Sequence, residues 1–151
     1  MIELKGIKKV YKNKNGVSTT ALNNVNLKFG ESGLDFILGK SGSGKSTLLN
    51  IIGGLDNYSD GSMTINGKPT SDFSEKNWDA YRNTYIGFIF QEYNLLDSYT
   101  VEKNIKLAMK LQNKSCSTSD ILKALKLVGL EDILKKKPYE LSGGQKQCVA
   151  I

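Results

Sequence analysis

The stretch that decides the fold is LDFILGKSGSGKSTLLNIIGG, residues 34–54. It begins with a short apolar run, LDFILG (34–39), which ends in glycine as a buried strand does. A glycine-rich loop follows. Residues 45–52 then carry apolar side chains at helical spacing, and the pair Gly53-Gly54 ends that segment as a helix C-terminus does. The stretch therefore predicts a strand, a glycine loop and a helix in succession.

The loop itself, GKSGSGKST (39–47), matches the pattern GxxxxGK[ST] in the strand and helix context that a phosphate-binding loop requires. Its glycines let the backbone N–H groups converge on phosphate oxygens, and the following helix adds its positive end. Lys45 is expected to reach the β- and γ-phosphates, Ser46 to ligate Mg2+, and Thr47 to contact an inner phosphate. The residues expected to bind nucleotide are Gly39, Lys40, Ser41, Gly42, Ser43, Gly44, Lys45, Ser46 and Thr47. The loop alone does not choose among kinases, GTPases and transport ATPases.

A second glycine pair lies in LSGGQ (141–145). Ser142 and Gln145 have the spacing of a capping box, which predicts that a helix begins here. Gly143 and Gly144 leave the first N–H groups of that helix without side-chain cover, so an outside anion can reach its positive end. On capping alone, an ordinary capped helix is the simpler interpretation and a phosphate from another molecule is the alternative.

Composition limits the class of protein. The chain of 151 residues is 39% hydrophobic and 24% charged, as expected for one folded, soluble domain. No secretion signal or membrane span is recognisable in the sequence. Cys116 and Cys148 lack disulfide or zinc spacing, which favours a reducing compartment, and the absence of histidine excludes catalysis by an imidazole of these residues. The net charge of +6 is scattered, so nucleic acid is not an expected partner.

Hydrophobic periodicity outlines the rest of the chain. Further strands are predicted at 2–11, 21–29, 60–68 and 85–90, with a turn at Asn66-Gly67. Helices are predicted around 75–81, 101–112 and 118–130. The last is expected to place on one face Ile121, Leu122, Leu125 and Val128, and to end at Gly129. The segment 113–119 is the most linker-like and is expected to join two helices.

LSGGQ downstream of GKSGSGKST, with FQEYNLL (90–96) between them, resembles the nucleotide-binding domain of an ABC transporter. The resemblance runs from the first strand to the last residue. The segments GGLD, YRNTYIGFIFQEYNLL and TVEKNI are similar to the ATPases of bacterial lipoprotein-releasing, macrolide-export and antimicrobial-peptide-resistance transporters. The implied fold is α/β: a P-loop NTPase core with an antiparallel β subdomain and a helical subdomain. The implied division is a core with β subdomain at 1–93, a helical subdomain at 94–140, and the signature motif with the start of its helix at 141–151.

The resemblance also implies roles for residues outside the loop. Tyr11 falls where the family stacks an aromatic ring on adenine, and Gln91 where it places a glutamine beside Mg2+ or the attacking water. Mg2+ would then be held by Ser46 and Gln91, with ATP as the nucleotide. The signature residues would contact the ATP of a second copy in a head-to-tail dimer; they are Leu141, Ser142, Gly143, Gly144 and Gln145. Membrane permease subunits, at the inner face of a bacterial membrane, are the other implied partners.

The chain departs from the family pattern after its signature helix. The family continues to a strand ending in Asp-Glu and to a loop with a histidine, and neither stands in these residues. The expectation is therefore a fragment of a longer domain, or a sheet completed by another chain or a rearrangement, with the C-terminal part of the core missing. Without those groups, little or no hydrolysis is expected from this chain alone. Cys148 also replaces a common arginine of the signature helix.

Two other functions are compatible with the nucleotide loop. One is a non-catalytic nucleotide-binding or regulatory module that is natively this short. The other is a DNA-repair or chromosome-structure ATPase, but only 93 residues separate Thr47 from Leu141 and none form the heptad run of a long coiled coil. The transported substrate, the direction of transport and the permease are not set by these residues.

Overall fold

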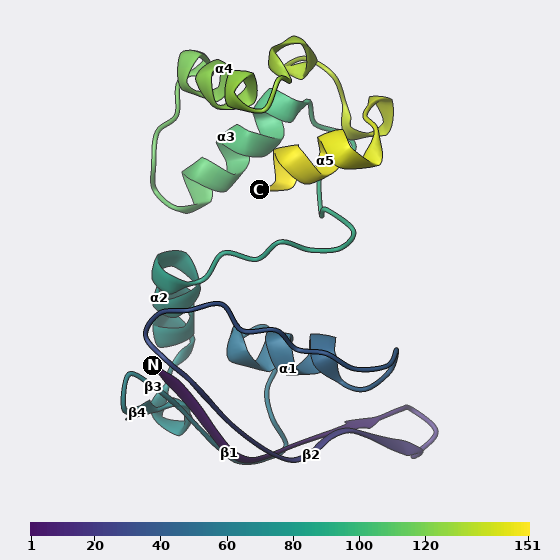
Figure 1. Cartoon of the computed structure of the whole chain (residues 1–151), viewed down its shortest axis with the longest axis vertical. Helices are drawn as coiled ribbons and strands as arrows, with labels where there is room; N and C mark the ends of the chain where they lie inside the picture. Colours follow the sequence, from purple (N-terminus) through teal and green to yellow (C-terminus); the bar gives the residue numbers. More distant parts are fainter. The chain divides into compact units, whose positions relative to one another are not determined.

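The computed structural model describes residues 1–151 as two compact units, Met1–Gly87 and Phe88–Ile151 (Figure 1). Each unit has a hydrophobic core of its own. The phosphate loop belongs to the first unit and the LSGGQ segment to the second. No helix is both long and apolar enough to cross a lipid bilayer.

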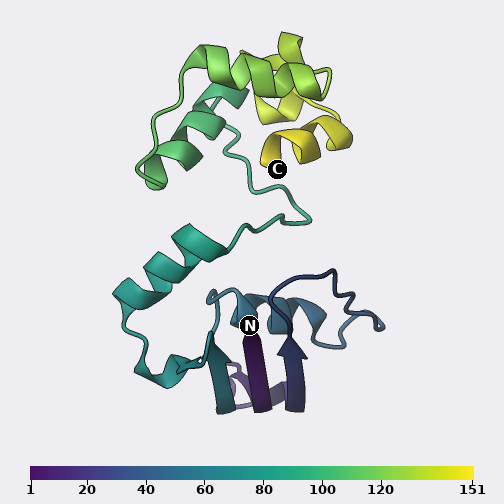
Figure 2. The same cartoon turned by 60° about the vertical axis from the view of Figure 1, so that its left-hand side comes forward.

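The first unit is built on an antiparallel sheet of four strands in the order β2-β1-β3-β4, whose neighbouring strands stand side by side in Figure 2. The strands are β1 (Ile2–Lys12), β2 (Ser18–Phe29), β3 (Asp60–Ile65) and β4 (Lys68–Pro69). Between β3 and β4, Asn66 and Gly67 have φ angles of 50° and 77°, and two successive positive φ angles are what a type I′ turn requires. The strands predicted at 2–11 and 21–29, the strand predicted within 60–68 and the turn at Asn66-Gly67 are confirmed.

Helix α1 (Lys45–Ile52) packs on this sheet. Its buried residues Leu48 and Ile51 join a core with Leu4 and Ile7 of β1. The helix predicted to follow the glycine loop is confirmed. The apolar residues of this segment recur at helical spacing, so they face the sheet together.

Helix α2 (Glu75–Tyr85), which follows the short 3-10 helix η1 (Thr70–Asp72), is tied to the end of α1 by two side chains. The hydroxyl of Tyr81 donates a hydrogen bond to the carbonyl of Ile52 at 2.9 Å. The guanidinium of Arg82 donates to the carbonyl of Gly54 at 2.6 Å. These bonds occupy carbonyls that the end of a helix leaves without partners, and they fix α2 against the helix that carries the phosphate loop.

Two of the predicted strands are not strands. The segment 34–39 has no regular structure and makes no ladder with any strand, and Leu34, Phe36 and Leu38 are 79%, 76% and 87% exposed. The segment 85–90 begins at the end of α2 and continues as irregular chain. Both segments have the apolar pattern of buried strands. A strand also needs hydrogen-bond partners on the main chain of a neighbouring strand, and an apolar pattern cannot supply them. Neither segment has such partners.

The second unit is all-helical, as its periodicity predicts. Its elements are α3 (Val101–Leu111), α4 (Thr118–Leu127), the 3-10 helices η2 (Glu131–Ile133) and η3 (Pro138–Glu140), and α5 (Gly143–Ala150). Ile121 and Leu125 of α4 are buried in its core, which also includes Leu141 and Val149 on either side of the glycine pair. The predicted stop at Gly129 is confirmed by its φ of +68°.

The buried face of α4 is narrower than predicted. Leu122 is 37% exposed and Val128 is 51% exposed, so neither joins Ile121 and Leu125 in the core. Leu122 follows Ile121 directly and therefore points about 100° around the helix, while Val128 lies at the C-cap where the helix ends. The linker predicted at 113–119 does connect α3 to α4, although its last two residues already belong to α4.

Glu102 of α3 joins three parts of this unit. Its carboxylate accepts hydrogen bonds from Lys106 at 2.7 Å, from Lys135 at 2.6 Å and from the hydroxyl of Thr118 at 2.6 Å. These bonds hold the pKa of Glu102 at about 2, below its ordinary value of 4.5. The carboxylate thus connects α3 to the start of α4 and to the segment that leads toward LSGGQ.

Candidate functional site

The phosphate loop turns on two glycines in the left-handed region. Gly42 has a φ of +77° and Gly44 a φ of +89°, a conformation that side chains with a Cβ rarely adopt. Gly44 also lies so close to β2 that a Cβ there would meet the carbonyl oxygen of Ala21 at 2.4 Å. Because Gly44 is the N-cap of α1 and has no side chain, the first N–H groups of α1 carry no side-chain cap. That helix end is therefore open to an anion.

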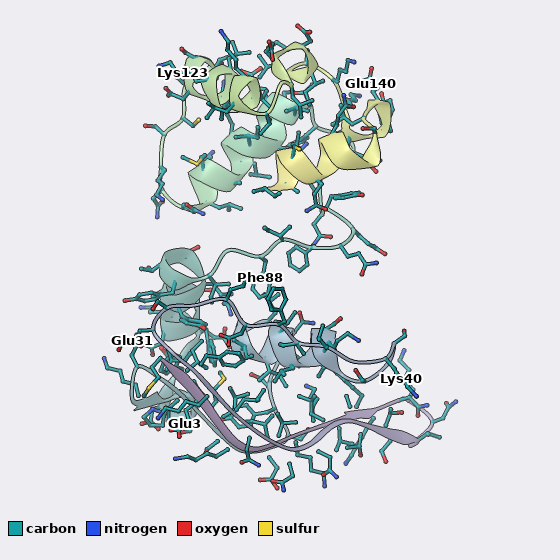
Figure 3. The ribbon with its side chains drawn as sticks, in the orientation of Figure 1. Glu3, Glu31, Lys40, Phe88, Lys123 and Glu140 are labelled. Atoms are coloured by element: carbon teal, nitrogen blue, oxygen red, sulfur yellow. The ribbon has the colours of Figure 1, made fainter.

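Lys45 lies back over this loop. Its ammonium group donates to the carbonyl oxygens of Gly39 at 2.8 Å and Lys40 at 2.7 Å, and lies 3.5 Å from the hydroxyl of Ser43. The loop therefore holds one positive charge beside the open end of α1. The side chain of Ser46 is exposed in the first turn of α1 and its hydroxyl makes no hydrogen bond within the chain, so its oxygen is free to bind a cation. Lys40, labelled in Figure 3, is an exposed residue of the same loop.

Tyr11 lies near the end of β1 and is held by a cluster that the sequence did not indicate. Its hydroxyl donates to Asp56 at 2.7 Å, and the ammonium group of Lys9 lies 4.8 Å from the centre of its ring. Lys9 also pairs with Asp56. Partial burial raises the pKa of Asp56, but the hydrogen bonds from Lys9 and Tyr11 outweigh it, so the pKa is lowered overall. Tyr11 is 42% exposed, so part of its surface remains available for stacking.

The signature segment forms the predicted capping box. The hydroxyl of Ser142 accepts from the N–H of Gln145 at 3.3 Å, and the side-chain oxygen of Gln145 accepts from the N–H of Ser142 at 2.9 Å. Leu141 is buried and anchors the segment in the core of the second unit. Gly143 and Gly144 are exposed, and the first turn of α5 contains no acidic residue. The capping box thus leaves the N–H groups of Gly143 and Gly144 without a side-chain partner, shortly after Glu140 in Figure 3.

Gln91 lies in an exposed turn of the second unit. The expected site residues are thus divided between the units. Tyr11 and residues 39–47 are in the first, and Gln91 and residues 141–145 are in the second. Within the first unit the structure brings together the loop, Lys45 and the start of α1. Within the second it assembles a separate bare helix end.

These features have a counterpart in a known family. A model of the ABC transporter family matches residues 22–151, which is most of the chain. The chain belongs to this family. The resemblance to an ABC transporter ATP-binding domain and the implied P-loop fold are therefore confirmed.

Curated ABC proteins match the whole chain. An uncharacterised ABC transporter ATP-binding protein of Methanocaldococcus jannaschii is 43% identical over 153 residues, and the chain covers 68% of its length. An ABC transporter ATP-binding protein of Mycoplasma pneumoniae is 42% identical over 152 residues, and the chain covers 32% of that longer protein. The chain thus spans between about a third and two thirds of these relatives.

A solved ABC cassette has the same fold. The dimeric structure of the bacterial ABC transporter cassette MJ0796 matches the chain with a TM-score of 0.85 and 39% identity, covering all of the chain and 67% of the cassette. The same cassette has been solved in a post-hydrolysis state bound to ADP and Pi, with a TM-score of 0.85 and 38% identity, covering 99% of the chain and 67% of the cassette. At this identity the likeness extends beyond the general fold to the ABC cassette type.

Proposed function

We propose that this chain is the N-terminal part of the ATP-binding subunit of an ABC transporter, and that its phosphate loop binds Mg-ATP. The observation that carries the proposal is the uncapped start of α1 with Lys45 held beside it. A helix end with free N–H groups, a tight glycine turn and one lysine is a phosphate site. This arrangement supports the proposed contacts of residues 39–47 with the nucleotide.

In this proposal Lys45 exchanges its loop carbonyl partners for phosphate oxygens when nucleotide binds. Carbonyl oxygens are neutral and phosphate oxygens are charged, so the exchange strengthens each hydrogen bond of the ammonium group. Ser46 offers a hydroxyl oxygen of the type that Mg2+ prefers, and the side-chain oxygen of Gln91 is another of that type. Mg2+ would neutralise part of the phosphate charge. Tyr11 offers the exposed face of its ring to the adenine, with its hydroxyl fixed by Asp56.

We further propose that residues 141–145 bind the nucleotide of a second copy in a head-to-tail dimer. The helix start in the second unit, where the N–H groups of Gly143 and Gly144 have no side-chain cap, supports this, and the similar cassette MJ0796 has been solved as a dimer. The dimer would act on membrane permease subunits from the inner face of the membrane, with ATP hydrolysis by the complete protein driving transport. The relatives of this chain are named as transporter ATP-binding proteins, which supports a permease as partner.

The test is equilibrium binding of a fluorescent ATP analogue with Mg2+ to the full-length protein and its variants. Lys45→Ala removes the charge beside the start of α1 and is expected to weaken binding at least about a hundredfold, since two or more charge-assisted hydrogen bonds disappear. Lys28→Ala is the control. It removes an equal charge from an exposed position of β2 outside the loop, and is expected to change affinity less than about threefold.

Unchanged affinity in Lys45→Ala would refute the assignment of this loop. Binding by the wild type without turnover of ATP, in the presence of its permease, would instead favour the non-catalytic module.

A further inference from the structure

Tyr93 has an unusual backbone conformation. It follows Gln91 by two residues, and Tyr93 and Asn94 have φ angles of +62° and +53°. The turn is closed by hydrogen bonds from the N–H of Tyr93 to the carbonyl of Phe90 at 3.2 Å and from Asn94 to Glu92 at 2.7 Å. Side chains other than glycine rarely take the left-handed region, asparagine more often than tyrosine. Such conformations persist where the surroundings fix them, frequently at functional sites.

The segment after this turn is anchored to the helices. Leu95 packs against the core cluster that includes Leu141 and Val149. The amide nitrogen of Asn104 donates to the carbonyl oxygens of Leu96 and Tyr99 at 3.2 and 3.3 Å. Tyr93 is therefore held from its C-terminal side by the same core that holds Leu141 of the signature segment and Val149 of α5.

The side chain of Tyr93 reaches the signature segment. A Cβ placed on Gly143 would lie 3.1 Å from the hydroxyl oxygen of Tyr93, whereas one on Gly144 would meet nothing within 4 Å. The hydroxyl makes no hydrogen bond within the chain, and no buried side-chain oxygen lacks a partner, so this hydroxyl is not fully buried. An O–H donor without a partner thus stands beside the first residue of α5, where the N–H groups of Gly143 and Gly144 have no side-chain cap.

We propose that Tyr93 is part of the signature phosphate site. Its hydroxyl donates a hydrogen bond to the same nucleoside triphosphate of a second copy that the N–H groups at the start of α5 contact, and its position leaves little room for a Cβ at residue 143. The proposal rests on the head-to-tail dimer of the proposed function. Phenol is a neutral donor, so it can stand beside this positive helix end without repulsion and add a directed bond to a phosphate oxygen.

The test measures ATP-driven dimerisation of the full-length protein by sedimentation velocity, with Mg2+ and a slowly hydrolysed ATP analogue. Tyr93→Phe removes only the hydroxyl and is expected to raise the dimer dissociation constant at least about tenfold, as expected for a hydrogen bond to a charged group. Binding of a fluorescent ATP analogue to the phosphate loop of the monomer should not change. Tyr99→Phe, which removes an exposed hydroxyl of the same segment, is the matched control and should leave dimerisation unchanged.

A second pair of variants tests the contact between Tyr93 and Gly143 independently of the Tyr93→Phe substitution. Gly143→Ala brings a methyl group against the hydroxyl of Tyr93 and is expected to weaken dimerisation more than Gly144→Ala. In the Tyr93→Phe background the methyl group has room, so Gly143→Ala should then add no further loss beyond that of Gly144→Ala. Both glycines lie in the first turn of a helix, where alanine fits the backbone, and a thermal melt of each variant checks folding.

The inference would be overturned if the wild type dimerises, Tyr93→Phe dimerises equally well, and Gly143→Ala and Gly144→Ala weaken dimerisation equally. That result would leave the head-to-tail dimer itself supported. A wild type that binds nucleotide but never dimerises would overturn the head-to-tail proposal together with the inference.

Discussion

Gly54→Ala should destabilise the first unit through one specific collision. Gly54 has a φ of +70°, and a Cβ there would lie 2.4 Å from Cε3 and 2.6 Å from Cζ3 of Trp78. Trp78 cannot simply turn away, because it packs edge-on against Phe73 at 5.1 Å and against Tyr81 at 5.8 Å between ring centres. Relief of the collision must therefore move α2 or the end of α1.

Gly67→Ala is the matched control for the backbone. Gly67 has a φ of +77°, but nothing lies within 4 Å of its Cβ position. The left-handed conformation costs an alanine about 1–2 kcal/mol at either site, so this cost cancels between the variants. The collision at Gly54 should add about 1–3 kcal/mol, the usual cost of overpacking. In a unit of this size each kcal/mol shifts the melting temperature by about 4–8 °C, so Gly54→Ala should melt at least about 4 °C below Gly67→Ala.

The assay is thermal unfolding followed by tryptophan fluorescence. Trp78 is the single tryptophan of the chain, so the signal arises at the point of collision. A repeat in the Trp78→Ala background, followed by circular dichroism, should abolish the difference between the two glycine variants. Equal melting temperatures of Gly54→Ala and Gly67→Ala with Trp78 present would refute the reasoning.

Three further predictions concern the acid stability, the core and the ring of Tyr11. The folded-state pKa of Glu102 is lowered to about 2. The stability that its ion pairs add is therefore present above about pH 4.5 and is lost as the pH falls from 4.5 to 2. In urea unfolding, the free energy of unfolding of Glu102→Gln should fall less over that pH range than that of the wild type. Ile121→Ala should lower the free energy of unfolding of the second unit by about 2–5 kcal/mol, measured by circular dichroism. Leu127→Ala, at an exposed position of the same helix, should change that free energy by no more than about 0.5 kcal/mol. Tyr11→Phe should retain nucleotide affinity within about threefold and Tyr11→Ala should not, since stacking needs the ring; an equal loss in both would assign the role to the hydroxyl held by Asp56.

The local parts of the site could be predicted from sequence because their geometry depends on residues close together in the chain. The capping box from Ser142 to Gln145 spans four residues, and its two hydrogen bonds form as predicted. The phosphate loop is likewise a short segment whose glycines fix its turn, and the helix at Lys45 begins where the pattern places it.

The features that could not be predicted from the sequence depend on residues far apart in the chain. The segments 34–39 and 85–90 have strand-like sequences, but pairing is decided by neighbours elsewhere in the chain, and the structure gives them none. The link from Tyr11 to Asp56 joins residues 45 positions apart, so no local spacing indicated it. The contact of Tyr93 with Gly143 likewise crosses the helical unit, and only the structure places the hydroxyl there.

The apolar segment with Leu34, Phe36 and Leu38 has a consequence for biosynthesis. The first unit consists of consecutive residues, so it can fold as soon as residue 87 has emerged from the ribosome, ahead of the second unit. At roughly 5–20 residues per second, residues 88–151 take about 3–13 seconds to synthesise. Until the second unit has emerged, the nascent chain displays three exposed apolar side chains immediately before its phosphate loop. A chaperone that recognises short hydrophobic segments would meet this segment before the signature segment has emerged.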